Sequence, residues 1–203
     1  MRISRRILAG LATASLAVTA TSCGGGSDKA SFDNEVTVGI LHSLSGVMSI
    51  SEKTLVETEK MAIAEINAAG GINIDGESYE IKYVVEDGAS NWPLFAEKAG
   101  QMIDAGYPVI FGGWTSASRD AMEPVFESKK GFLYYPIQYE GRECSNNIMY
   151  TGATPNQQSE PATDFMLNRS KASGKPFFLV GSDYVFPRTS NSITKAQLEA
   201  IGG

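Results

Sequence analysis

The stretch VTVGIL at residues 36–41 begins an alternation of strands and helices that decides the fold. Its short run of β-branched and apolar residues is typical of a strand buried inside a sheet. A helix is predicted directly afterwards over residues 49–69, because Ser49 and Glu52 match the spacing of a capping box and two glycines follow. The next candidate strand, YEIKYVVE at residues 79–86, alternates in polarity. The fold therefore starts as strand, helix, strand.

The same alternation continues along the rest of the sequence. Further strands are predicted over residues 109–112, 132–135, 148–151 and 177–181, and further helices over 95–103, 116–128, within 156–171 and over 193–200. Helices that alternate with strands indicate a parallel sheet covered by helices on both faces. The sequence therefore predicts the α/β class, with doubly wound parallel sheets.

The composition is that of an ordinary globular protein. The 203 residues are 42% hydrophobic and 20% charged, with a formal net charge of −6. These values exclude a collagen-like, low-complexity or wholly disordered chain. The acidic balance argues against a nucleic-acid partner, because a nucleic-acid-binding face needs clustered Lys and Arg.

The N-terminus has the pattern of an export signal. Arg2, Arg5 and Arg6 precede an apolar segment at residues 7–18, which is shorter than the roughly 20 apolar residues of a membrane span. Residues 1–22 are therefore predicted to be a signal peptide. The paired arginines also match a twin-arginine signal weakly, and the sequence leaves the export route open.

Cys23 is the candidate residue for lipid attachment. It follows the small residues ATS at 20–22, which resemble the segment before a lipoprotein cleavage site. Residues 23–35 would then form a lipid-anchored tether, made flexible by its glycines. The alternative is ordinary cleavage after Ala20. Both alternatives predict an exported protein, located in the periplasm or at the cell surface.

Hydroxyl and aromatic side chains gather in the loops that follow the predicted strands. In parallel sheets ligands bind beyond the carboxyl ends of the strands, so these loops form the candidate site. Hydroxyls and free N–H groups at a helix start can hold a carbonyl oxygen, and aromatic walls can exclude water. The candidates are Thr115 and Ser116 for the carbonyl oxygen, Trp114, Tyr135, Tyr184 and Phe186 for the walls, and Asp183, with Glu140 as a weaker candidate, for N–H groups.

These residue types suit a small neutral ligand with one carbonyl and several N–H groups. Each residue also has a plain structural explanation. The aromatic residues can belong to the core, Ser116 can be a helix N-cap, Asp183 can cap its own helix, and Glu140 can be a solvated loop residue. The sequence leaves these alternatives open.

No catalytic, metal or cofactor site is predicted. The chain has one histidine, His42, which cannot make a usual zinc site with Cys23 and Cys144. The sequence contains no G-x-S-x-G, P-loop or G-x-G-x-x-G motif. Cys144 would need a nearby base to act as a nucleophile. The protein is therefore predicted not to be an enzyme.

Several stretches resemble one family of proteins. They are VGILHSLSG at 38–46, EINAAGG at 65–71, VVEDGAS at 84–90, FGGWTSASR at 111–119, YYPIQYEGRECSNNIMYTGATPNQQ at 134–158 and VGSDYVFPRTSN at 180–191. In these stretches the chain resembles the urea-type substrate-binding proteins of ABC transporters. The same branch also holds short-chain amide binding proteins and an amide sensor.

The resemblance implies the periplasmic binding protein type I fold, a clamshell of two doubly wound lobes that closes on its ligand. It implies that urea or a short-chain amide is bound and delivered to the permease subunits of an ABC transporter, without a cofactor. At position 138 the urea-like proteins also carry Gln. The residues that the resemblance places around the ligand are Trp114, Thr115, Ser116, Tyr135, Gln138, Asp183, Tyr184 and Phe186.

The resemblance also implies how the chain is divided, because members of the family are considerably longer. Residues 36–155 are expected to form an incomplete first lobe, and residues 156–203 the start of a truncated second lobe. The alternative function is an amide-sensing regulatory protein with the same cleft, which the export signal disfavours. A third hypothesis, an amidase that uses Cys144, would require turnover of urea or formamide.

Overall fold

The computed structural model describes residues 31–168 and 174–201 of the chain. The predicted signal peptide at 1–22 and the predicted lipidation site Cys23 lie outside these residues. In the described part, no helix combines the length and the apolar character that a membrane span requires. The strands are β1 (Asn34–His42), β2 (Ile72–Ile74), β3 (Glu77–Asp87), β4 (Ile110–Gly112), β5 (Leu133–Tyr135) and β6 (Ile148–Tyr150). The helices are α1 (Ser49–Ala68), α2 (Trp92–Asp104), α3 (Ser116–Lys129), η1 (Pro155–Gln157), α4 (Ser159–Asn168) and α5 (Val185–Ile201).

The strands form one sheet in the order β2-β3-β1-β4-β5-β6. β1 pairs in parallel with β3 and β4, β4 with β5, and β5 with β6. This arrangement confirms the predicted α/β class. The sequence analysis does not predict the short edge strand β2, which pairs antiparallel with β3 through a turn where Asp75 and Gly76 have positive φ.

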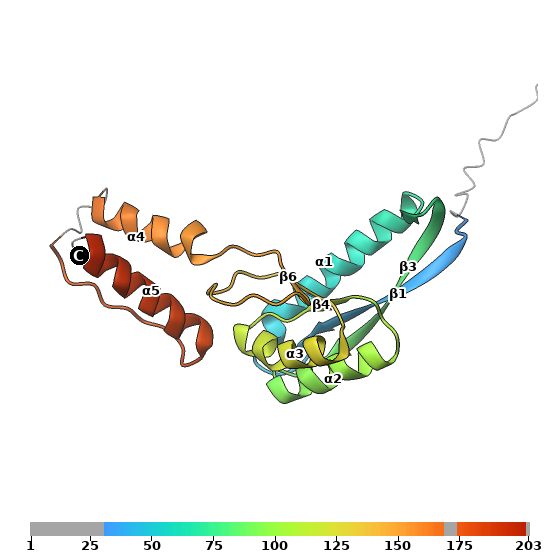
Figure 1. Cartoon of the computed structure of the whole chain (residues 1–203), viewed down its shortest axis with the longest axis horizontal. Helices are drawn as coiled ribbons and strands as arrows, with labels where there is room; N and C mark the ends of the chain where they lie inside the picture. The colour runs from blue at the N-terminus through green and yellow to red at the C-terminus, as the bar shows by residue number, and fades with distance from the viewer. Residues whose placement is uncertain (1–30, 169–173, 202–203) are drawn as a thin grey trace, which may run out of the picture.

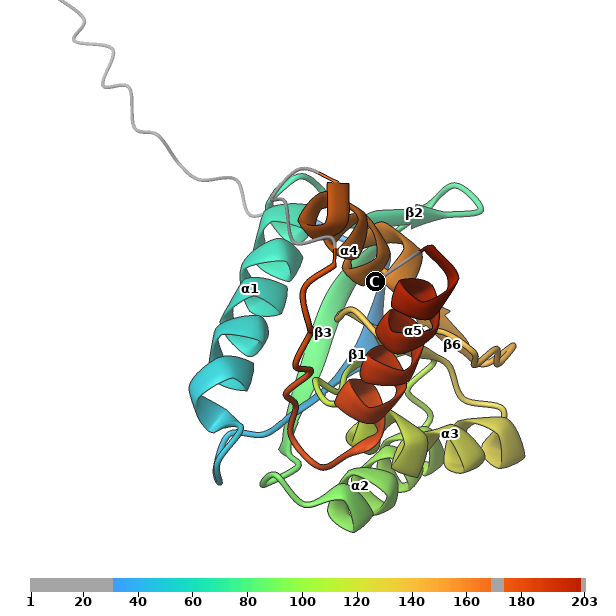
Figure 2. The same cartoon turned by 90° about the vertical axis from the view of Figure 1, so that its left-hand side faces the viewer.

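Helices cover both faces of the sheet, as predicted. Successive residues of β1 point to opposite faces, so Ile40 packs with Val56 and Ile63 of α1. Figures 1 and 2 show α1 on one side of the strands and α2 with α3 on the other. Leu41 packs on that second face among side chains from α2 and α3, namely Phe95, Ala99, Met102, Met122 and Phe126.

Beyond β6 the chain leaves the sheet and forms α4 and α5, which pack against each other (Figure 1). The predicted strand over residues 177–181 is wrong: the segment is irregular, and Phe178 and Val180 are 92% and 79% exposed. A strand needs a partner for its backbone groups, and none of the described strands pairs with this segment. The last helix starts at Val185, well before the predicted range of 193–200.

The predicted capping box at the start of α1 is also wrong. Met48 is the N-cap residue, and its side chain makes no capping hydrogen bond. Ser49 Oγ donates to the carbonyl oxygen of Gly46 at 2.8 Å. The carboxylate of Glu52 instead accepts the backbone N–H of Ser43 at 2.5 Å. A contact with the loop after β1 therefore replaces the local contact that the sequence pattern predicts.

Candidate functional site

The loops at the carboxyl edge of the parallel strands hold most of the predicted site residues. Trp114 to Ser116 follow β4, and Gln138 lies in the loop after β5. Gly113 has a positive φ and donates its N–H to the carbonyl oxygen of Leu41 at 3.0 Å. This bond ties the loop after β4 to the end of β1, so neighbouring loops are fixed relative to one another.

A small cavity of about 90 Å³ lies between this edge of the sheet and the start of α5. None of its lining residues carries a formal charge, which suits an uncharged solute. Apart from Ile137, all of them were predicted from the sequence. The lining residues are Trp114, Ser116, Ile137, Gln138, Tyr184 and Phe186.

Thr115 is the N-cap of α3, so the capping role considered for Ser116 belongs to its neighbour. The Thr115 side chain accepts the N–H of Ser118 at 3.0 Å, and Ser118 Oγ donates to the Thr115 carbonyl oxygen at 2.7 Å. Thr115 is only 4% exposed. Its hydroxyl therefore orders the loop that carries Trp114, and the structure does not place it among the residues that line the cavity.

Ser116 joins the cavity to a buried network of charges. Its Oγ donates to Glu140 Oε2 at 2.6 Å, and Arg119 Nη2 donates to Glu140 Oε1 at 2.8 Å. Arg119 also donates to Glu143, from Nε at 2.7 Å and from Nη2 at 2.6 Å. Glu140 is 4% exposed, so it is not a solvated loop residue, and Arg119 compensates its charge.

Arg119 is fully buried, and the sequence analysis misses it. Its guanidinium lies 5.0 Å from the ring centre of Tyr135 and 5.4 Å from that of Tyr139, distances at which a cation is attracted to the ring face. Burial opposes the charge, but the hydrogen bond to Glu143 and the charges of Glu140 and Glu143 outweigh it and raise the pKa of Arg119. The sequence could have indicated that Arg119 is buried, because it lies on the same helix face as the apolar residues Met122 and Phe126.

Tyr135 lies beneath the cavity as a support and does not line it. Its ring is fully buried, and its hydroxyl donates to the carbonyl oxygen of Trp114 at 3.1 Å. Burial raises the pKa of Tyr135 well above its usual range, so the hydroxyl remains a donor at physiological pH. The predicted aromatic wall at this position is therefore a core residue that holds the backbone of Trp114.

The second side of the cavity comes from the start of α5. Tyr184 and Phe186 line the cavity from there, whereas Asp183 is not among the lining residues and has an 86% exposed side chain. Asp183 accepts a hydrogen bond from Arg188 Nε at 2.7 Å. Burial, followed by the charge of Glu140, raises the pKa of Tyr184, so its phenol also stays protonated.

The remaining chemical groups near this edge do not form a reactive centre. One carboxylate oxygen from each of Asp120, Glu140 and Glu143 lies within 4.8 Å of the other two. Arg119 forms ion pairs with all three carboxylates. The exposed Cys144 has no histidine partner, because the single histidine of the chain is buried beside Glu52 and Glu59. The arrangement is an uncharged cavity beside a buried network of paired charges.

Solved structures of three solute-binding proteins have a similar fold. LivJ, the substrate-binding protein of a branched-chain amino acid transporter from Streptococcus pneumoniae, was solved with isoleucine. Its sequence is 17% identical and its TM-score is 0.66, and the match covers 80% of this chain and 46% of LivJ.

The solute-binding protein of an ABC transporter from Rhodopseudomonas palustris BisB5 was solved with 3,4-dihydroxy benzoic acid. Its sequence is 21% identical and its TM-score is 0.70, and the match covers 83% of this chain and 45% of that protein.

The leucine-binding protein LivK from Thermotoga maritima is 17% identical with a TM-score of 0.67, over 83% of this chain and 47% of LivK. At such low identities the likeness shows the fold alone. The chain spans less than half the length of each of these proteins. A family model described as a periplasmic binding protein domain matches residues 36–203. The chain therefore belongs to the periplasmic binding protein family, with the type I α/β fold.

Proposed function

We propose that this chain is part of an extracytoplasmic solute receptor, which captures urea or a short-chain amide and delivers it to the permease of an ABC transporter. The observation that carries the proposal is the uncharged cavity between Trp114, Ser116 and Gln138 on one side and Tyr184 and Phe186 on the other. Trp114 and Gln138 lie in the loops after β4 and β5, and Ser116 begins α3. Tyr184 directly precedes α5, and Phe186 lies in its first turn.

The size and lining of the cavity favour a small planar amide. The cavity volume of about 90 Å³ is several times the roughly 10–15 Å³ that a single water molecule needs. The Ser116 hydroxyl and the Gln138 amide offer donors and acceptors, and the aromatic rings offer flat walls. A free amino acid carries an ammonium and a carboxylate, for which the lining offers no charged partner.

The mechanism is closure of two lobes on the ligand, with no covalent step. Residues 36–155 would belong to the first lobe and residues 156–203 to the second. A ligand that contacts both sides of the cavity binds the closed form better than the open form and therefore stabilises it. The export signal at residues 1–22 and lipid attachment at Cys23 would hold the receptor outside the cytoplasm, beside its transporter.

The test is a fluorescence titration of the full-length protein with urea, formamide, acetamide and isoleucine. Trp114 lines the cavity and Trp92 does not, so a response from the cavity should persist in Trp92→Phe and be lost in Trp114→Phe. We expect saturable changes with urea or a short amide and none with isoleucine. Saturation with isoleucine alone would overturn the ligand assignment, and hydrolysis of urea or formamide would overturn the receptor role.

A further inference from the structure

His42, the last residue of β1, lies fully buried between two glutamates of α1. Its Nε2 is 3.1 Å from Glu59 Oε1, and its Nδ1 is 3.6 Å from Glu52 Oε2. Within the part of the chain that the structure describes, His42 Nδ1, Glu52 Oε1 and Glu59 Oε2 are buried without a hydrogen-bond partner. The three side chains therefore compensate one another's polar groups, and the stability of the cluster depends on their charges.

The two glutamates occupy positions where α1 otherwise presents apolar residues to the sheet. Glu52, Val56, Glu59 and Ile63 follow one another at helical spacing, and Val56 and Ile63 pack in the core beneath the helix. Two carboxylates in this stripe cost stability unless a cation compensates them. His42 is the basic side chain that the structure places between them.

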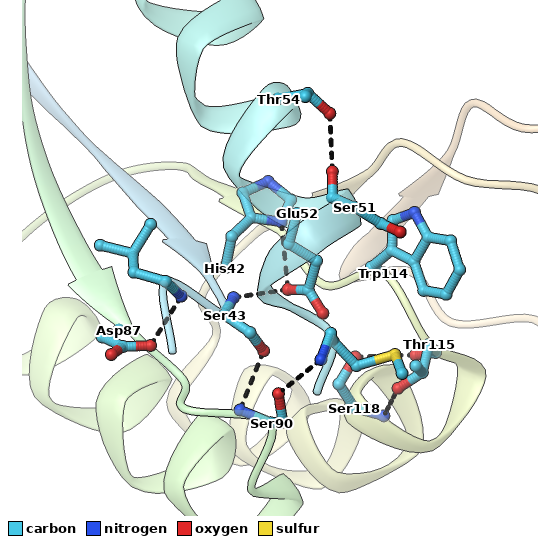
Figure 3. Close-up of polar contacts among 12 residues, drawn as sticks. His42, Ser43, Ser51, Glu52, Thr54, Asp87, Ser90, Trp114, Thr115 and Ser118 are labelled. Carbon is cyan, nitrogen blue, oxygen red and sulfur yellow. Dashed lines mark hydrogen bonds and ion pairs between the residues drawn. The ribbon is translucent and has the colours of Figure 1, made fainter. Parts of the chain in front are cut away.

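Glu52 connects this cluster to the loop between β1 and α1, as Figure 3 shows. Its Oε2 accepts the N–H of Ser43 at 2.5 Å, and Ser43 Oγ accepts the N–H of Ser90 at 3.0 Å. Ser90 Oγ in turn accepts the N–H of Met48 at 3.0 Å. The loop at residues 43–48 is thus held at one end by Glu52 and further along by the loop that follows β3.

The same cluster is also linked to the candidate cavity. The carbonyl oxygen of Leu41, directly before His42, accepts the N–H of Gly113, directly before Trp114. Because β1 and β4 are neighbouring parallel strands, their loops leave the sheet side by side. A shift of His42 and Ser43 would therefore reach the backbone that carries Trp114.

The charge state of His42 follows from its neighbours. Burial disfavours the imidazolium, but hydrogen bonds and charges from Glu52 and Glu59 outweigh it and raise the pKa of His42 above its ordinary value. On β3, Asp87 is the register partner of His42, yet its carboxylate accepts N–H groups of Leu44, Ser45 and Ala89. On β4, the neighbouring residues Gly112 and Gly113 carry no charge.

We infer that His42, Glu52 and Glu59 are positioning residues of the binding site, in which the protonated imidazole holds both carboxylates and thereby fixes the β1–α1 loop beside Trp114. Loss of the proton leaves the buried carboxylate of Glu52 and the partly buried carboxylate of Glu59 without a cation, and the loop loosens. The role in ligand affinity rests on the proposed function, whereas the link between His42 and Trp114 does not. Affinity for urea should then fall as the pH rises through the titration of His42.

The first test is nuclear magnetic resonance of the His42 imidazole in the full-length protein, identified as the signal that His42→Gln removes. We expect His42 to titrate above the ordinary value of about 6.5, with the Trp114 indole signal shifting along the same curve. The signal that disappears in Trp114→Phe assigns that indole. Titration at or below the ordinary value, or a Trp114 signal that does not follow it, would overturn the inference.

The second test uses a matched pair of glutamates on α1. Glu59→Gln removes the charge beside His42, whereas Glu57→Gln removes an exposed charge that pairs only with Lys60 among the described residues. Glu59→Gln should lower the His42 titration and weaken urea binding at neutral pH by about fivefold or more, and Glu57→Gln should change neither. Equal effects of the two variants would contradict the positioning role.

The outcomes separate this inference from the proposed function. If urea does not bind but His42 and Trp114 still titrate together, the ligand assignment is wrong and the coupling stands. If urea binds but its affinity does not change over the pH range in which His42 titrates, the positioning role is wrong. Near-ultraviolet circular dichroism checks that Glu59→Gln is folded, and the wild-type titration decides the coupling if it is not.

Discussion

Arg119 and His42 are two fully buried basic side chains near the same edge of the sheet, and each lies between two glutamates. Arg119 donates to Glu140 and Glu143, and His42 lies between Glu52 and Glu59. A guanidinium keeps its charge at every physiological pH, whereas an imidazole can lose its charge close to neutrality. One support of the candidate site is therefore permanent, and the other depends on pH.

The two supports also differ in what they hold. Arg119 fixes Glu140, which accepts the hydroxyl of the cavity residue Ser116. His42 acts on the loop after β1 through Glu52 and Ser43. The cavity lining can be uncharged because the charged groups that order its loops lie outside the lining and are paired with one another.

Replacement of the permanent cation should have the largest effect. Arg119→Met leaves Glu140 and Glu143 without their counter-ion, and we expect a loss of about 3–5 kcal/mol in the free energy of unfolding. Guanidinium chloride denaturation measures this loss. Arg188→Met, which removes an exposed partner of Asp183, is the control and should be close to neutral. Similar losses for the two variants would contradict the structural role of Arg119.

Replacement of His42 should cost less, and the cost should depend on pH. His42→Gln should destabilise the protein by about 2 kcal/mol at mildly acidic pH. Because the pKa of His42 is raised in the folded protein, its stabilisation is fully present below the ordinary value and is lost as the pH rises through the folded one. Denaturation at several pH values should show the variant and the wild type converging at alkaline pH. A constant difference would argue against an imidazolium.

Two adjacent hydroxyls should separate loop order from ligand contact. Thr115→Ala removes the N-cap of α3 and Ser116→Ala removes the hydrogen bond to Glu140, so each should cost about 1 kcal/mol of stability. Only Ser116 lines the cavity, so Ser116→Ala should weaken urea binding more than Thr115→Ala does. Calorimetry on both variants checks this order, and the reverse order would place the ligand elsewhere.

Asp183 should show the smallest effect on stability. It is exposed and paired with Arg188, so Asp183→Asn should leave the unfolding midpoint unchanged. The family resemblance nevertheless assigns it to the ligand, and we expect about fivefold weaker urea binding in the full-length protein. Unchanged affinity would remove Asp183 from the site.

The strands and helices of the sheet could be predicted because their signals are local. The apolar runs at β1 and β3 and the helix patterns of α1 and α3 are visible in the sequence. The error over residues 177–181 has a tertiary cause, since an apolar run becomes a strand only beside another strand.

The residues that line the candidate cavity had signals in the sequence, whereas the contacts that support it had none. Trp114 follows a strand end, which the pattern of loops indicates, and the family resemblance indicates Gln138. Phe186 is expected after a strand that does not form, and it lines the cavity from the first turn of α5 instead. The contact between Arg119 and Glu140 and the contact between Glu52 and Ser43 join different elements. Glu52 also matched a local capping pattern, which concealed its tertiary role.

The central claim is that the uncharged cavity binds urea or a short-chain amide. Isothermal titration calorimetry of the full-length protein with urea, formamide, acetamide and isoleucine tests it most directly, with Trp114→Ala as the site variant and Trp92→Phe as the matched control. We expect saturable heat with urea or a short amide, lost in Trp114→Ala and retained in Trp92→Phe. Saturable heat with isoleucine and none with urea, formamide or acetamide would contradict it.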